Sequence, residues 1–122
     1  MQHEPGNTST VYVVTADDSK DLTDAKRYGR LRGVFTRSKR PYNTAHIILK
    51  ARAALKDFQA GDSLLMVGDP TLCAVCLAIV LEYNGAVRIL QWDKLSFEYT
   101  VQEWDFDSPI PAPADDDFIP VD

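Results

Sequence analysis

The chain has 122 residues, of which 45% are hydrophobic and 25% are charged. This composition excludes wholesale disorder and leaves room for one domain of ordinary size. The net charge of −5 is unevenly distributed, because residues 20–56 hold eleven lysines and arginines against two acids, whereas residues 57–122 hold two basic residues against thirteen acids. Such asymmetry within one chain points to a nucleic-acid or anionic-surface site.

The longest uncharged run, residues 70–81, is too short to span a bilayer, so we expect no membrane partner. The first ten residues contain no apolar stretch, which predicts the absence of a secretory signal. Two cysteines without such a signal indicate a reducing environment. We therefore expect the protein in the cytoplasm.

Hydrophobic periodicity and turn residues predict eight elements, in the order β-α-β-α-β-α-β-β. In chain order they are strand 10–15, helix 21–28, strand 31–36, helix 44–59, strand 63–67, helix 70–83, strand 86–91 and strand 96–104. In the last strand, Trp104 falls out of phase with Tyr99 and Val101, which predicts a bulge or a strand end near Glu103.

This order predicts a small single-domain α/β fold with a mostly parallel sheet, two or three helices and an antiparallel hairpin at its end. It is not the order of an OB-fold. The domain should cover residues 10–104, after a flexible N-terminus of residues 1–9. Residues 105–122 carry six acids, no base and four of the seven prolines, and predict a disordered acidic tail.

Residues 26–42 form the strongest candidate site, because they combine seven cations with three aromatic residues and contain no acid. Cations hold the backbone of single-stranded nucleic acid while aromatic faces stack on its bases. The alternative is a solvated basic surface with Phe35 in the core. The predicted contacts are Lys26, Arg27, Tyr28, Arg30, Arg32, Phe35, Arg37, Lys39, Arg40 and Tyr42, helped by Arg52 and Lys56 of the following helix.

Three other motifs have simpler explanations. Cys73 and Cys76 lie near a helix start, where a thiol pKa falls, but apolar neighbours favour buried and inert cysteines. The Gly68-Asp69 strand end is explained by helix capping, although a ligand could bind there. His3 and His46 lack a catalytic or metal-binding constellation around them. We expect no metal and no cofactor.

The tail contains Asp115, Asp116 and Asp117, followed by Phe118 and Ile119. It resembles the acidic tip of bacterial single-stranded-DNA-binding proteins, which docks on partner proteins and competes with DNA. In that family the phenylalanine comes last, whereas here Asp122 ends the sequence. The resemblance implies a partner-binding role for these five residues.

Five motifs resemble a family of small phage-encoded α/β proteins over residues 10–104. They are Val11-Tyr12-Val13-Val14, Tyr28-Gly29, Gly68-Asp69-Pro70, Tyr83-Asn84 and Leu90-Gln91-Trp92-Asp93. One branch, similar in size, basic segment and acidic tail, binds single-stranded DNA and brings a phage RNA polymerase to melted promoters. The resemblance implies no catalytic residues.

The leading interpretation is a non-enzymatic single-stranded-DNA-binding protein of a phage, acting in transcription or replication. Its tail would recruit a phage RNA polymerase or a replication protein. Two alternatives stay open: a small nucleotide-binding enzyme or sensor that uses Gly68-Asp69, and an acidic DNA mimic that inhibits a host factor. The sequence also leaves open a homo-oligomer.

Overall fold

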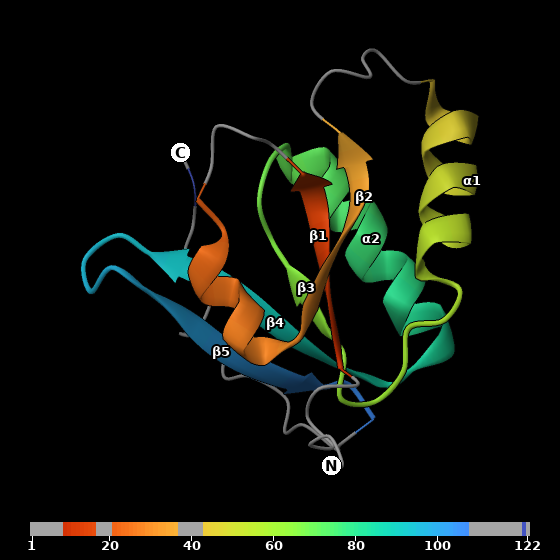
Figure 1. Cartoon of the computed structure of the whole chain (residues 1–122). Helices are drawn as coiled ribbons and strands as arrows, with labels where there is room; N and C mark the ends of the chain where they lie inside the picture. The colour runs from red at the N-terminus through yellow and green to blue at the C-terminus, as the bar shows by residue number, and fades with distance from the viewer. Residues whose placement is uncertain (1–8, 17–20, 37–42, 108–120, 122) are drawn as a thin grey trace, which may run out of the picture.

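The computed structural model describes residues 9–16, 21–36, 43–107 and 121 (Figure 1). Five strands form a single sheet in the order β2-β1-β3-β4-β5. They are β1 (Thr10–Ala16), β2 (Arg30–Thr36), β3 (Ser63–Leu65), β4 (Ala86–Asp93) and β5 (Glu98–Asp105). The first four are mutually parallel, and β5 runs antiparallel to β4. The predicted α/β fold with a mostly parallel sheet and a final hairpin is confirmed.

Helices cover both faces of the sheet. One face, here called the helix face, packs against α1 (Thr44–Leu55) and α2 (Pro70–Tyr83). The opposite face, here called the η2 face, packs against the short 3-10 helix η2 (Thr23–Tyr28), as Figure 1 shows. None of these helices is long and apolar enough to cross a membrane, within the ranges that the structure describes.

Local signals explain where the two long helices begin. The side chain of Asn43 accepts a hydrogen bond of 2.8 Å from the backbone N–H of His46, which caps α1. Asp69 caps α2 by accepting from the N–H of Thr71 at 2.8 Å, and Pro70 takes the first helical position, where no N–H is needed. Both starts agree with the sequence-based expectation.

The core lies mainly between the sheet and the two long helices. Leu55 of α1, Val80 of α2 and Leu64 of β3 are fully buried there. A smaller cluster on the η2 face joins Val11, Val13, Leu65 and Leu90 to Ala25 of η2. Each such aliphatic side chain larger than alanine contributes about 1.5–3 kcal/mol on burial. Strand β3 is buried on both faces, which explains why the apolar run that begins at Leu64 shows no alternation with polar residues.

Several element boundaries differ from the prediction. The first helix is a 3-10 helix that starts at Thr23, α1 ends at Leu55 rather than near residue 59, and β3 ends at Leu65. The β4–β5 register is regular from Ala86↔Asp105 to Asp93↔Glu98, so there is no bulge near Glu103, and β5 ends two residues later, at Asp105. Trp104 lies on the opposite face from Tyr99 by regular strand alternation, and it packs against the core of the helix face. Apolar residues therefore occupy both faces of β5.

Candidate nucleic-acid interface

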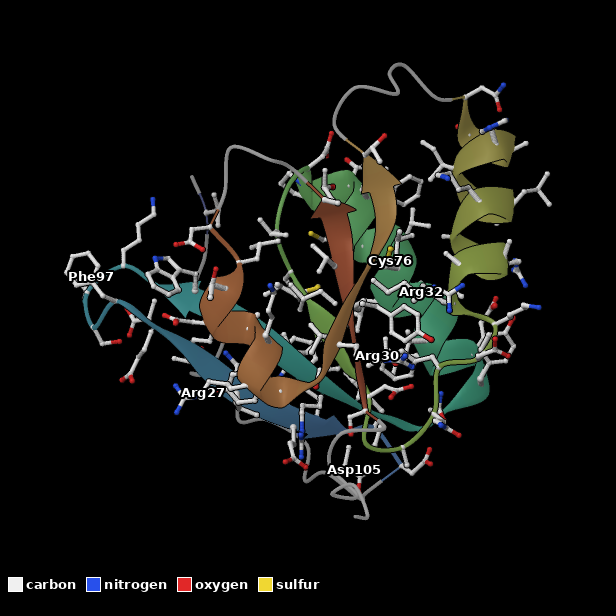
Figure 2. All side chains as sticks on the ribbon, in the orientation of Figure 1. Arg27, Arg30, Arg32, Cys76, Phe97 and Asp105 are labelled. Atoms are coloured by element: carbon white, nitrogen blue, oxygen red, sulfur yellow. The ribbon has the colours of Figure 1, made fainter. Side chains whose placement is uncertain are left out.

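Strand alternation divides the predicted basic site between the two faces of the sheet. Arg30 and Arg32 share the helix face with Val34, whereas Leu31 between them packs on the η2 face. Figure 2 shows Arg30 and Arg32 on the α1 side, while Arg27 projects from η2 on the other side. The described cations of the basic stretch therefore form two groups on opposite faces of the sheet, and they do not form one continuous surface.

Two cations of the helix face, Arg32 and Arg52, have polar partners within the domain. Burial raises the pKa of the Tyr12 hydroxyl, Asp62 raises it further, and Arg32 lies close enough to oppose that shift. On α1, the Arg52 guanidinium forms a 3.0 Å ion pair with Glu82. Lys56 is exposed at the end of α1. These contacts give Arg32 and Arg52 structural roles within the folded domain.

Phe35 does not belong to an interface. Its ring is 0% exposed and packs in the core of the helix face. A buried ring cannot stack on a base while the domain stays folded, so the expected role of Phe35 in base stacking is corrected to a role in the core. This is the alternative that the sequence left open for this residue.

The η2 group combines cations with an aromatic ring. Lys26 and Arg27 are exposed in the last turn of η2, and the Arg27 guanidinium carbon lies 5.7 Å from the ring centroid of Tyr28. This distance is typical of a cation–π contact. Gly29 then makes a tight turn at φ +148°, and a Cβ there would lie 2.6 Å from the Ser9 carbonyl oxygen. The turn requires glycine and fixes η2 against the start of β1.

The β4–β5 hairpin adds exposed apolar side chains that the sequence interpretation missed. Trp92 is 41% exposed, Leu95 is 93% exposed and Phe97 is 74% exposed. The Trp92 and Tyr99 rings pack edge to face, with centroids 5.0 Å apart. Phe97 was expected inside the strand but occupies the turn, at the end of the hairpin in Figure 2. Turns usually carry polar residues. Two large apolar residues, Leu95 and Phe97, in the turn that follows Asp93 were therefore the sequence signal for an exposed apolar site.

The hairpin turn is well ordered by hydrogen bonds to Asp93. Its carboxylate accepts from the Leu95 N–H and the Ser96 hydroxyl, each at 2.9 Å, and these bonds hold the pKa of Asp93 below its usual value. The backbone carbonyl of Asp93 accepts from the Phe97 N–H at 2.8 Å. The turn therefore presents Leu95 and Phe97 to solvent in a defined position.

Helix η2 and the hairpin lie on the same face of the sheet. Tyr99 packs in the same small cluster as Ala25 of η2. Burial raises the pKa of the Tyr99 hydroxyl, and the nearby carboxylates of Asp24 and Asp21 raise it further. The η2 face thus carries Lys26 and Arg27 in the last turn of η2 and the Trp92–Tyr99 ring pair of the hairpin, and the carboxylates beside Tyr99 are those of Asp24 and Asp21.

Several predicted site residues lie outside the described residues. They are Arg37, Lys39, Arg40 and Tyr42 of the basic stretch, and Asp115, Asp116, Asp117, Phe118 and Ile119 of the tail.

Cys76 is buried and Cys73 is partly buried. Burial raises the pKa of Cys76 to about 12 and also raises the pKa of Cys73, with smaller contributions from neighbouring acidic groups. Across the described ranges, no cluster of histidine, cysteine and acidic side chains is arranged to hold a metal ion. At the Gly68-Asp69 strand end, Asp69 serves as the cap of α2, and Gly68 packs directly against Thr15.

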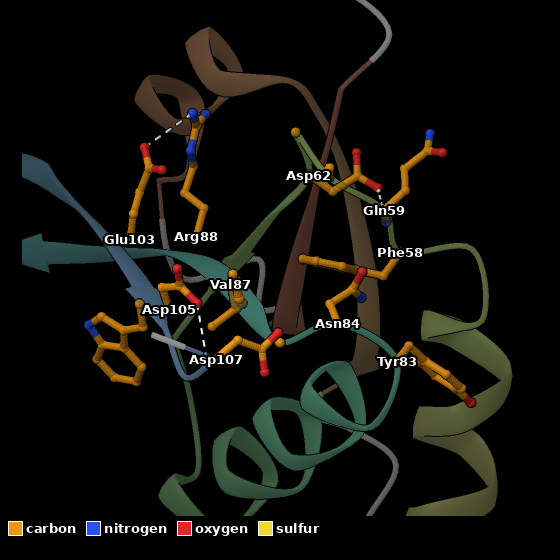
Figure 3. A pocket seen from close by; sticks show the side chains of 15 residues that line it. Phe58, Gln59, Asp62, Tyr83, Asn84, Val87, Arg88, Glu103, Asp105 and Asp107 are labelled. Atoms are coloured by element: carbon orange, nitrogen blue, oxygen red, sulfur yellow. Dashed lines mark hydrogen bonds and ion pairs between the residues drawn. The ribbon is translucent and has the colours of Figure 1, made fainter. Parts of the chain in front are cut away.

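A cavity of about 580 Å³ lies at the end of the sheet where β4 begins and β5 ends (Figure 3). Its lining includes Asp62, Asp105, Asp107 and an Arg88–Glu103 ion pair of 3.5 Å. Asp62 accepts two backbone hydrogen bonds, from Thr10 and Gln59, at 2.9 and 3.0 Å. The lining is mainly acidic, so this cavity does not suit a nucleic-acid backbone.

Comparison with protein families gives one match. The model of the phage Pam3 gp32-like protein family matches residues 9–106, which contain the whole five-stranded sheet. No curated protein and no solved structure matches the chain. The match confirms the predicted relation to a small phage protein family.

Proposed function

The chain belongs to the phage Pam3 gp32-like family, and from this premise we propose that it binds single-stranded DNA and catalyses no reaction. One observation carries the proposal: η2, with Lys26 and Arg27 exposed in its last turn, packs on the same face of the sheet as the Trp92–Tyr99 ring pair of the hairpin. If a single DNA strand lies across this face, the cations can bind its phosphates and the rings can stack on its bases.

The physical basis is the accessibility of unpaired bases. Stacking of one base on an aromatic side chain contributes about 1–3 kcal/mol, and duplex DNA does not offer its bases in this way. Tyr28, beside Arg27, adds a third ring. Arg37, Lys39, Arg40 and Tyr42 stay in the proposed interface on the basis of the sequence alone.

The biological role that we propose is that of a cofactor in phage transcription or replication. The acidic tail, with Phe118 and Ile119, would then recruit a phage RNA polymerase or a replication protein. Within the tail, residues 108–122, which follow β5, hold four acids and no base. DNA would repel these residues, which supports separate roles for the tail and the basic surface.

Fluorescence anisotropy with single- and double-stranded oligonucleotides of the same sequence tests the proposal. The single strand should bind more tightly at matched salt. If four to six cations contact phosphates, log affinity should fall with log salt at a slope of about −3 to −4, from about −0.7 per contact. A flat salt response, or equal affinity for the duplex, would refute the proposal.

Two double variants separate charge from stacking. Lys26→Ala with Arg27→Ala should reduce the salt slope by about 1.4, because two phosphate contacts are lost. Trp92→Ala with Phe97→Ala should lower the affinity while leaving the slope unchanged. The matched control is Lys50→Ala with Lys56→Ala on α1, which removes two cations from the other side of the sheet. If only this control weakens binding, the interface lies on the helix face.

A further inference from the structure

The sheet ends in two edge strands. Strand β2 pairs with β1 alone and β5 pairs with β4 alone, within the part of the chain that the structure describes. They are seven and eight residues long, and neither contains a proline or a lysine, the residues that commonly protect an edge from pairing. Each edge therefore offers unpaired backbone donors and acceptors to another strand.

The two edges carry opposite charge. Strand β2 contains Arg30 and Arg32, both exposed, and no acid. Strand β5 contains Glu98, Glu103 and Asp105, all exposed, and no base. Glu103 contacts Arg88 at 3.5 Å, but its side chain remains 71% exposed. The strand order thus converts the uneven charge of the sequence into a basic edge and an acidic edge on opposite sides of one domain.

This distribution selects between the pairings that two copies could make. Two β2 edges, or two β5 edges, would place like charges opposite each other, which destabilises strand pairing. Arg30 and Arg32 lie on the helix face, whereas Glu103 and Asp105 lie on the η2 face. A β2 edge that runs parallel to a β5 edge of another copy therefore places these charges on the same side of the sheet and extends the sheet by backbone hydrogen bonds. Charge thus disfavours both symmetric pairings and favours the unlike one.

We propose that β5 of one copy of this protein pairs with β2 of a second copy, in a head-to-tail contact. Such a contact leaves one basic and one acidic edge available at the ends of the assembly, so association continues until a ring closes or a filament forms. The inference concerns the sheet edges alone and does not depend on DNA binding. It assigns Arg30 and Arg32, which lie away from the η2 face, to an interface between copies.

Sedimentation velocity of the full chain without nucleic acid tests this contact. Mass should increase with protein concentration at about 0.01 M salt and fall toward the monomer at about 1 M salt, where charges are screened beyond about 3 Å. A protein that stays monomeric at low salt over the accessible concentrations refutes the proposal.

Charge-reversal variants identify the edges. Arg30→Glu with Arg32→Glu makes both edges acidic, and Glu98→Lys with Glu103→Lys makes the β5 edge basic. Each variant alone should associate about tenfold or more weakly than the native chain, because like charges then face each other. An equimolar mixture of the two should regain association, because each reversed edge finds an unlike partner.

The controls separate the contact from loss of fold and from net charge. Lys50→Glu with Lys56→Glu changes the net charge as much as the β2 reversal but lies on α1, and it should associate like the native chain. Circular dichroism reports the fold, and Glu98→Gln with Glu103→Gln replaces the β5 reversal if that variant unfolds. Association that survives both edge reversals, or a mixture that does not recover it, places any contact elsewhere and overturns the proposal.

Discussion

Replacing Thr15 with valine should stabilise the protein. Thr15 lies near the end of β1 and is 7% exposed, and its hydroxyl has no hydrogen-bond partner among the described residues. The side chain is tightly enclosed, since a Cβ added to Gly68 would lie only 2.4 Å from the Thr15 Oγ1. Valine has nearly the same shape and replaces this hydroxyl with a methyl group.

The expected gain follows from the cost of an unsatisfied buried polar group. Leaving such a group without a partner costs about 1–3 kcal/mol. We expect Thr15→Val to raise the free energy of unfolding by about 1 kcal/mol, the lower end of that range. This value assumes that the structure around the side chain is unchanged by the substitution. For a domain of about 100 residues, this corresponds to an increase of about 4–8 °C in melting temperature.

Thr100→Val is the matched control, because it makes the same chemical change at a hydroxyl that has a partner. The Thr100 Oγ1 donates a 3.2 Å hydrogen bond to the Gln91 carbonyl oxygen, so its loss should cost about 0.5–1.5 kcal/mol. Urea denaturation of both variants measures the two signs directly. If Thr15→Val loses stability like Thr100→Val, the Thr15 hydroxyl is hydrogen-bonded in solution and the reasoning fails.

Three further predictions concern the cysteines, the hairpin and the tail. Because burial raises the pKa of Cys76 to about 12, its thiol stays protonated in the folded state while the unfolded thiol ionises above its ordinary pKa. Between the ordinary pKa of the unfolded thiol and this folded pKa, the free energy of unfolding should therefore fall by up to about 1.4 kcal/mol per pH unit, and the fall should be smaller in Cys76→Ala. The thiols of the native protein should react slowly with a labelling reagent, and fast labelling would contradict their burial. Phe97 has φ +57°, so Phe97→Gly should remove roughly 1 kcal/mol of backbone strain and raise the melting temperature. The same variant should bind single-stranded DNA more weakly, because it loses the exposed ring. A lower melting temperature would contradict the strain. A chain that ends at Asp107 has thirteen basic and fourteen acidic residues. It should keep its circular dichroism spectrum and bind DNA at least as tightly as the full chain, with the largest gain at low salt. Weaker binding would place the tail in the interface.

Local signals in the sequence were sufficient for the order of elements. Asn43 and Asp69 predict helix starts because their side chains satisfy backbone donors, whatever the rest of the chain does. The run from Ser63 predicts a central strand because burial on both faces removes the alternation of polar residues. Such features depend on residues that are adjacent in the chain, so they can be recognised from the sequence alone.

The errors arose where contacts between distant segments decide the outcome. Trp104 seemed to require a bulge, because the sequence does not reveal that both faces of β5 meet apolar neighbours. Phe35 could be read either as a stacking ring or as core, and only its contacts across the sheet decide in favour of the core. The position of the hairpin rings beside η2 depends on the strand order, which no local pattern specifies.

The separation of cations by β2 predicts that DNA binding and self-association can be lost independently. Lys26 and Arg27 lie on the η2 face, whereas Arg30 and Arg32 lie on the opposite side, at the edge. Arg30→Glu with Arg32→Glu should therefore weaken association about tenfold or more while each monomer keeps most of its intrinsic affinity for a short single strand. Lys26→Ala with Arg27→Ala should have the converse effect. On long single strands, the native chain should bind cooperatively, since neighbouring copies touch, and the edge variant should bind without cooperativity. Anisotropy titrations on short and long oligonucleotides measure both quantities. If the edge variant loses affinity for the short strand as strongly as the η2 variant does, the two groups of arginines serve one surface, and the division between the faces has no functional meaning.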